Sequence, residues 1–307
     1  MEGRVTTGGS EVWRERRSPA RLACLLGPAA VLVGGLVGYN ALVWHVFGLA
    51  PNQVNAGAVP FTADPWRPLP GMLLHIDGSR HQWFQDERWY DLIVILDDAT
   101  SEIYYARLVE EESTATVMAG LREVIERKGV FCALYSDRGS HFWLTPKVGG
   151  KVDAHRLTQV GRALHELGVQ MIPAYSPQAR GRSERNFGTW QGRLPQELRL
   201  RQLGTLEAAN RFLREDYIAE FNRRFQVAPR QRGNAFVPCR NRDLERIFSL
   251  QFERSVNRDN TVSFQNLSLQ IERVRWRATL AGCQVVVHQH LDRTLSLSYG
   301  PHCLGHY

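Results

Sequence analysis

Three carboxylates in this chain stand where they could hold metal ions together. Asp77 and Asp137 each follow a short apolar run, residues 72–76 and 131–136, and a glycine comes one or two positions later. Glu184 lies just inside a segment expected to be helical. Three such acids can hold two Mg²⁺ ions about 3.5 to 4 Å apart. That arrangement suits the cleavage and transfer of phosphodiesters, where catalysis is mostly positioning and charge stabilisation.

Basic and aromatic residues near these acids favour DNA as the substrate. Gly78 and Gly139 leave room for a phosphate backbone to approach. Arginines cluster around Glu184, and an arginine fork matches the geometry of a phosphate. The alternative is that these arginines form a solvated helix face. The positions expected to contact DNA are Arg138, Arg180, Arg182, Arg185, Trp190 and Arg193.

The overall charge is consistent with a nucleic-acid partner. The net charge is +7 with an isoelectric point near 9.4. Only three of the 38 basic residues are lysines, and arginine is favoured where phosphates and bases are contacted. A G/C-rich genome would give the same bias, so both explanations stay open. The five cysteines are scattered without a Cys-x-x-Cys pair, which favours a reducing compartment over a disulfide framework.

The elements that must position the three acids follow from the hydrophobic pattern. Buried strands are expected at residues 71–76, 90–96, 103–109, 131–136 and 169–173. Amphipathic helices are expected at 114–128, 157–167 and 183–194, with Pro195 starting a new turn. This order predicts an α/β fold in which helices cover a mixed sheet.

The flanking regions differ from this central pattern. Residues 1–69 read as a leader and linker without a recognisable domain. Within them, residues 25–50 are apolar and long enough for a membrane span, although association with a membrane is not the favoured interpretation. The central domain is predicted at 70–228, with a helix at 205–225 that Thr205 caps. A linker at 229–244 and a small β-barrel at 245–307, interpreted as a DNA-binding tail, complete the chain.

Other acids, histidines and cysteines offer weaker alternatives. Asp97 and Asp98 could join the metal site, but turn formation explains them better. His75 shares a strand face with Asp77, where a core or supporting role is favoured over metal ligation. A zinc site in the tail is disfavoured, because the spacing matches no structural zinc pattern. Its members would be Cys283, His288, His290, His302, Cys303 and His306.

Three segments together resemble the integrase catalytic core, and more narrowly the ISNCY-type bacterial insertion-sequence transposases. They are residues 75–79 (HIDGS), 135–142 (YSDRGSHF) and 175–185 (YSPQARGRSER). The resemblance implies a ribonuclease-H-like fold, with Asp77, Asp137 and Glu184 as the catalytic acids and metal ligands. It implies two Mg²⁺ ions, for which Mn²⁺ can substitute. It also implies DNA cleavage and strand transfer at transposon ends, by a homo-oligomer in the cytoplasm at the nucleoid.

Two departures from that family bear on the expected activity. Asp137 and Glu184 are 47 positions apart, longer than is common, and residues 145–155 would form a surface insertion that leaves the site intact. The family carries helix-turn-helix segments before its core, and residues 1–70 show no such pattern. The alternative to an active transposase is therefore a catalytically silent remnant that only binds DNA.

Overall fold

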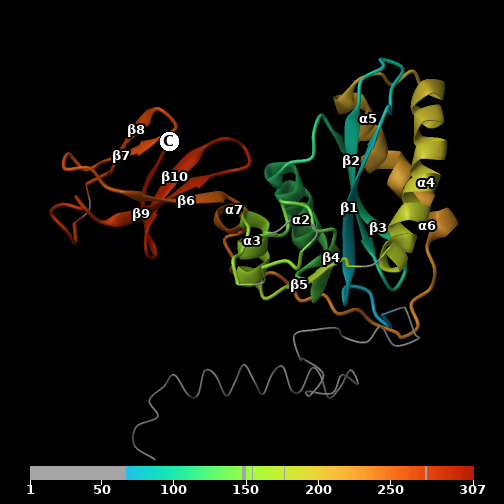
Figure 1. The fold of residues 1–307 in the computed structure, drawn as a ribbon, viewed down its shortest axis with the longest axis horizontal. Coiled ribbons are helices and arrows are strands. Elements are labelled where there is room, and N and C mark those ends of the chain that lie inside the picture. The colour runs from blue at the N-terminus through green and yellow to red at the C-terminus, as the bar shows by residue number, and fades with distance from the viewer. Residues whose placement is uncertain (1–66, 147–149, 154, 176, 274) are drawn as a thin grey trace, which may run out of the picture. The chain divides into compact units, whose positions relative to one another are not determined.

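A mixed five-stranded sheet forms the centre of the protein (Figure 1). The structure is a computed structural model that describes residues 67–146, 150–153, 155–175, 177–273 and 275–307, without the side chains of 177–186. The strand order is β3-β2-β1-β4-β5: the first three strands are antiparallel, and β4 and β5 run parallel to β1. The strands are β1 (Leu74–His81), β2 (Tyr90–Asp97), β3 (Ile103–Val109), β4 (Ala133–Ser136) and β5 (Gln170–Pro173).

Helices cover both faces of this sheet, as Figure 1 shows. On one face, α2 (Thr114–Lys128) and α3 (Gln159–Leu167) bury a cluster that includes Leu121 and Leu164. The other face is covered by α4, α5 and α6, which bury a second cluster around Trp190. Their bounds are α4 (Pro177–Leu200), α5 (Leu206–Phe212) and α6 (Ile218–Phe225). Both the layers and the strand order confirm the predicted ribonuclease-H-like α/β fold class.

Several predicted element ends were wrong: α4 begins at Pro177 and not at 183, β4 begins at Ala133 and not at 131, and two further differences bear on the site. β1 continues through Asp77 to His81 because it pairs with β2 along its whole length. Pro195 lies inside α4 and does not start a new turn. A proline in a helix interior costs about 3 kcal/mol. Continuing the helix buries Leu198 almost completely, and burying a leucine side chain returns about 1.5 to 3 kcal/mol.

The long helix predicted at 205–225 is present in three parts. Thr205 caps α5 as expected, with its side chain accepting from the backbone N–H of Ala208. A single π-helical segment, η3 (Leu213–Tyr217), then joins α5 to α6. π-Segments of this kind insert an extra residue into a helix and shift the buried face. Here Phe212, Leu213 and Tyr217 all stay in the cluster against the sheet.

Two asparagine side chains form hydrogen bonds with backbone groups on the free edge of the sheet, at β3. Asn210 of α5 accepts from the backbone N–H of Leu108 and donates to its carbonyl, both at 2.8 Å. Asn222 of α6 does the same at Ile103, at 2.8 and 3.0 Å. A side-chain amide carries one donor and one acceptor in the arrangement of a peptide group. The two helices therefore supply hydrogen bonds to the edge strand at two positions, Ile103 and Leu108.

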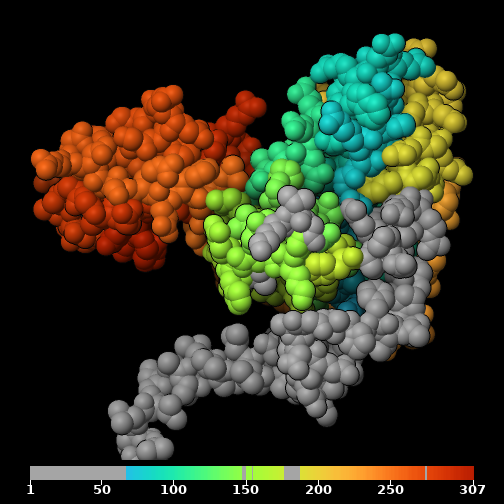
Figure 2. Space-filling view, viewed as in Figure 1, coloured from blue at the N-terminus to red at the C-terminus, as the bar shows by residue number. Residues whose placement is uncertain are grey.

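The C-terminal region is all-β, as predicted. A short helix, α7 (Leu244–Ile247), precedes an antiparallel sheet of order β11-β10-β9-β6 and a separate hairpin, β7–β8. One hydrophobic cluster, including Val262 and Leu297, is shared by sheet and hairpin. In the space-filling view (Figure 2) these residues, orange to red, pack as one body. The strands are β6 (Leu250–Ser255), β7 (Thr261–Phe264), β8 (Leu267–Gln270), β9 (Gln284–Gln289), β10 (Leu295–Tyr299) and β11 (His302–His306).

The predicted linker at 229–244 runs along the central sheet. Ala235 donates its N–H to the carbonyl of Pro70, and Val237 forms a bridge with Val130. Separately, none of the helices that the structure describes is long and apolar enough to span a membrane. The apolar stretch at 25–50 lies outside the described residues.

Candidate metal-dependent active site

Asp77 lies in the middle of β1, on the sheet face that α4 covers. The antiparallel ladder places it opposite Val94, whose side chain belongs to the cluster under α4. Ser79 is two residues further along, on the same strand face. Its hydroxyl accepts a 2.8 Å hydrogen bond from Nε2 of Gln191 in α4. The strand that carries Asp77 is therefore joined directly to that helix.

Asp137 directly follows β4, the parallel neighbour of β1. The register of the two strands pairs His75 with Tyr135. Continuing it by two residues brings position 77 level with position 137, on chains roughly 4.8 Å apart. Two acids that are 60 positions apart in the sequence thus meet at the point where β4 ends. The sheet topology thus brings the two positions onto neighbouring chains.

Each of these acids also accepts a hydrogen bond from the backbone just after it. Asp77 Oδ1 accepts from the N–H of Gly78 at 3.0 Å, and Asp137 Oδ1 accepts from the N–H of Gly139 at 2.9 Å. A Cβ atom at position 139 would lie only 2.9 Å from Asp137 Oδ1. A glycine at that position therefore keeps the carboxylate in its place.

Glu184 belongs to α4, as predicted, but its side chain lies outside the described residues. Position 184 precedes Gln191 by seven residues, two helical turns, so both positions lie on one face of α4. That is the face that contacts β1 through Ser79. Among the side chains that are described, no three histidines, cysteines or acids gather closely enough to hold a metal ion. The predicted ligand set depends on Glu184.

Glu112 is a fourth acid at this site that the sequence analysis missed. It lies between β3 and α2, where its backbone N–H donates to Asp91 Oδ2 at 2.7 Å. Its carboxylate packs against Gly78, so closely that any side chain at 78 would clash with it. Burial, together with the charges of Asp137 and Asp77, raises the pKa of the Glu112 carboxyl to about 7. The only sequence signal was a run of three glutamates, residues 110–112, before a helix cap.

The donor chemistry at this point of the sheet fits a divalent cation. Burial, and next the repulsion from the charges of Asp137 and Asp77, favours the protonated form of the neighbouring Glu112. A hard divalent ion with oxygen ligands would relieve that repulsion. The residues available to hold it are Asp77 and Asp137, together with position 184 on α4.

We expect Glu112 to make the metal-free protein less stable as the pH rises. Its pKa is raised in the folded state, so its carboxyl ionises only in the unfolded chain between about pH 4.5 and 7. Stability should therefore fall across this window and level off above it. The total is on the order of 2 kcal/mol after allowance for partial exposure.

Urea unfolding in EDTA at pH 5, 6, 7 and 8 measures this effect. Glu112→Gln should remove the fall, while Glu207→Gln, at an exposed surface position, should keep it. Equal pH slopes for the wild type and Glu112→Gln would contradict the expectation.

The residues predicted to contact DNA fall into three groups. Arg138 is exposed, lies 5.3 Å over the ring of Tyr175, and donates to the carbonyl of Gly150 at 3.1 Å. Arg193 is exposed on α4, over Phe225. The side chains of Arg180, Arg182 and Arg185 lie outside the described residues.

Trp190 is wrong as a DNA contact. Its side chain is fully buried between α4 and α6, with its ring stacked on Phe221 at 4.7 Å between centroids. A ring without exposed surface offers no face to a base. The helical spacing that put Trp190 near Glu184 also put it on the inward face, where Leu194 lies one turn further on.

Sequence comparison relates the chain to known proteins, although no protein-family profile matches it. The candidate transposase y4bF of Sinorhizobium fredii is 33% identical over 242 residues, 76% of this chain and 51% of that protein. The transposase for insertion sequence IS1202 of Streptococcus pneumoniae is 31% identical over 224 residues, 70% of this chain and 47% of the transposase. The chain is homologous to insertion-sequence transposases. It spans about half the length of these two relatives.

Solved structures with a similar chain path include two viral proteins. The HTLV-2 integrase catalytic core domain in complex with magnesium is 16% identical and has a TM-score of 0.36, over 47% of this chain and 85% of that chain. A chain of the simian T-cell lymphotropic virus intasome is 13% identical with a TM-score of 0.43, over 88% of both chains. Both are remote in sequence, so the site of this transposase homologue rests on its own residues.

The alternative metal ligands near β1 have structural roles in this transposase homologue. Asp97 accepts from the backbone N–H groups of Gly71 and Thr100, and burial raises the pKa of its carboxyl. Asp98 bonds Nε2 of the buried His75 at 2.9 Å. These acids fix the turn after β2, as the turn interpretation expected.

The histidines and cysteines of the tail do not form a zinc site within the described residues. His288 lies between two serine hydroxyls, 3.0 Å from Ser249 and 2.7 Å from Ser298. His290 bonds Ser296 at 2.8 Å. Burial lowers the pKa of the His288 imidazole to about 4, so this ring is neutral at physiological pH. Both rings belong to the interior of the β-sheet region.

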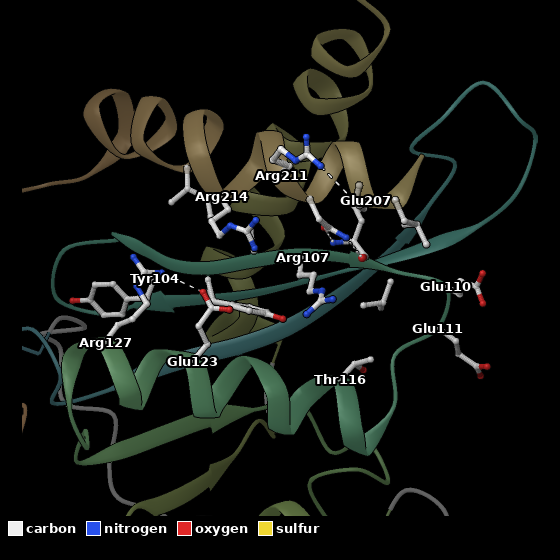
Figure 3. A pocket seen from close by; sticks show the side chains of 17 residues that line it. Tyr104, Arg107, Glu110, Glu111, Thr116, Glu123, Arg127, Glu207, Arg211 and Arg214 are labelled. Atoms are coloured by element: carbon white, nitrogen blue, oxygen red, sulfur yellow. Dashed lines mark hydrogen bonds and ion pairs between the residues drawn. The ribbon is translucent and has the colours of Figure 1, made fainter. Parts of the chain in front are cut away.

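A cavity of about 690 Å³ lies along the edge strand β3, away from the acidic site. Figure 3 shows its walls, which come from β3, α2 and α5. Charges of both signs line it, and several are already matched: Arg127 pairs with Glu123 at 3.3 Å and Arg211 with Glu207 at 3.4 Å. Neither Asp77 nor Asp137 contributes to this cavity. It is therefore not the place where we expect metal-dependent chemistry.

Proposed function

We propose that this protein is an ISNCY-type DDE transposase that cleaves DNA at insertion-sequence ends and transfers the strand to a target. The observation that carries the proposal is the parallel register of β1 and β4, whose extension brings Asp77 level with Asp137 just after β4, in a chain homologous to transposases. Position 184, on the α4 face that contacts β1, supplies the third acid. The substrate is DNA, and the protein acts as a homo-oligomer on chromosomal DNA in the cytoplasm.

Each of the three acids is positioned by a different element of the fold. Asp77 sits within a paired strand and Asp137 is held by its own turn, so the two carboxylates keep a fixed separation. Glu184, within α4, would complete the set. When bound, two Mg²⁺ ions, or Mn²⁺ in their place, would activate the attacking oxygen and stabilise the leaving oxygen. Arg138 and the arginines of α4 would hold the DNA phosphates.

Nicking of supercoiled plasmid by the full chain tests this proposal. We expect nicking with Mg²⁺ or Mn²⁺, none with EDTA, and a loss of more than about 100-fold in Asp77→Asn. Asp216→Asn, at an exposed position on η3, is the matched control and should nick normally. If a folded protein shows no metal-dependent nicking, the enzyme proposal fails.

The second candidate function is a catalytically silent remnant that only binds DNA. The net charge of +7 favours it as strongly as it favours the enzyme. It would bind DNA with a steep dependence on salt, as phosphate contacts require. It would show no nicking with either metal, and Asp77→Asn would leave its affinity for DNA unchanged.

A further inference from the structure

Three aromatic rings gather on the surface of the C-terminal sheet. Trp276 lies in the loop between β8 and β9 and is 47% exposed. Its ring stacks near that of Tyr299, at 6.0 Å and 19°, and near that of His302, at 4.9 Å and 32°. Single exposed apolar side chains are common on protein surfaces. Here Trp276 packs against the other two rings, and about half of its surface stays open to solvent.

The rings are held in place by the sheet. Tyr299 and His302 are a cross-strand pair at the tip of the β10–β11 hairpin. The loop that carries Trp276 is anchored before it, where Glu272 donates its N–H to the carbonyl of Leu304. After it, the N–H of Leu280 donates to the side chain of Asn260 at 2.8 Å. The three rings, called the platform below, are therefore largely held in place before any ligand binds.

The charge beside the platform is positive. Arg275 and Arg277 flank Trp276 in the sequence and both are exposed. Neither forms an ion pair with a carboxylate in the described part of the chain. Residues 245–307 contain seven arginines, of which three lie between 273 and 277. Guanidinium groups alternating with an aromatic face are what a nucleic-acid strand with exposed bases requires.

We propose that Trp276, Tyr299 and His302 form a stacking platform for an unpaired base of DNA, with Arg275 and Arg277 on the neighbouring phosphates. A stacked base needs an open face, which duplex DNA offers only at ends, overhangs and flipped positions. The partner is therefore DNA with unpaired nucleotides, such as the single-stranded flank that end cleavage leaves. The inference rests on the proposed function only in taking DNA as the partner.

Fluorescence anisotropy with labelled DNA tests the platform in the full chain. Trp276→Ala should weaken binding to a duplex with a 5-nucleotide overhang by about 5- to 100-fold, the range for losing one stacked base. Binding to the blunt duplex should change less than about 2-fold. Trp276→Phe, which keeps a ring, should recover most of the affinity. Trp89→Ala, at a residue that is 53% exposed on the catalytic domain, is the matched control.

A separate measurement tests the role of Arg275 and Arg277. Arg275→Gln with Arg277→Gln should lower the salt dependence of binding by about two phosphate contacts, for blunt and overhang DNA alike. Circular dichroism and thermal melting of each variant check the fold. Equal affinity of wild type and Trp276→Ala for overhang DNA would overturn the proposal. So would a Trp276→Ala protein that keeps its DNA affinity but changes its oligomeric state in light scattering.

The same proteins separate this inference from the catalytic one. An Asp77→Asn protein should bind overhang DNA as the wild type does, because the platform does not involve the acids. Normal nicking together with unchanged binding in Trp276→Ala overturns the platform and leaves the enzyme proposal standing. If the wild type shows no nicking but Trp276→Ala weakens binding as expected, the enzyme proposal fails and the platform stands.

Discussion

Replacing Asp137 with asparagine is expected to reduce metal-dependent DNA nicking by more than about 100-fold without unfolding the protein. Loss of a group that only supports a metal ligand already costs roughly 10- to 100-fold, so loss of a ligand should cost more. Asparagine keeps a side-chain oxygen that can accept from the N–H of Gly139, so the turn after β4 should survive. Only the charge and the second carboxylate oxygen are removed.

Single-turnover nicking with Mn²⁺ measures the effect, again beside Asp216→Asn. A second readout comes from Glu112, whose raised pKa depends in part on the charge of Asp137. In Asp137→Asn the pKa of Glu112 should move back toward its ordinary value, and the fall of stability with pH should shrink. Retained nicking in a folded Asp137→Asn protein would rule out the three-acid site.

Replacing Trp190 with alanine is expected to destabilise the protein by about 3 to 5 kcal/mol, the range for truncating a large buried aromatic side chain. Trp190 has no exposed surface and contacts the rings of Phe221 and Tyr217. Removing it leaves a cavity between α4 and α6. Because α4 also carries position 184, nicking should be lost at temperatures where this helix loosens.

Guanidinium unfolding compares Trp190→Ala with Trp89→Ala, which removes a side chain that is 53% exposed and should cost less than about 0.5 kcal/mol. The pair also distinguishes a buried role from a DNA-contacting one. A Trp190→Ala protein of normal stability but weakened DNA binding would mean that this ring faces the substrate after all.

Elements with strong local patterns were predictable from the sequence. β3 and α2 have the bounds that the pattern gives, because the apolar stripe of α2, including Val117 and Leu121, is buried as its spacing requires. Local signals also pointed to Asp77 and Asp137, since each follows an apolar run, although their nearness depends on β1 and β4 being neighbours in the sheet. Local patterns of this kind depend only on residues that are close in the sequence, so contacts between distant segments do not alter the elements that they predict.

The features that could not be predicted depend on contacts between distant segments. Glu112 reaches the site only because the connection from β3 to α2 passes over Gly78, 34 positions away in the sequence. Pro195 is tolerated because Leu198 beyond it finds a place in the core. Trp190 was predicted to contact DNA because a basic helix suggests an exposed surface. Only the packing of α4 against α6 shows which face of the helix is buried. The place of the Glu184 side chain stays a prediction.

The asparagine contacts at the edge of the sheet also have a consequence for protein synthesis. Asn210 and Asn222 come 102 and 119 residues after the β3 backbone groups that they cover. At ribosomal rates of about 5 to 20 residues per second, β3 leaves the ribosome roughly 5 to 24 s before Asn210 and Asn222 do. During that interval an uncovered strand edge can pair with another nascent chain. Chains on neighbouring ribosomes of one messenger would meet in this state, so slower translation after β3 should lower the yield of soluble protein.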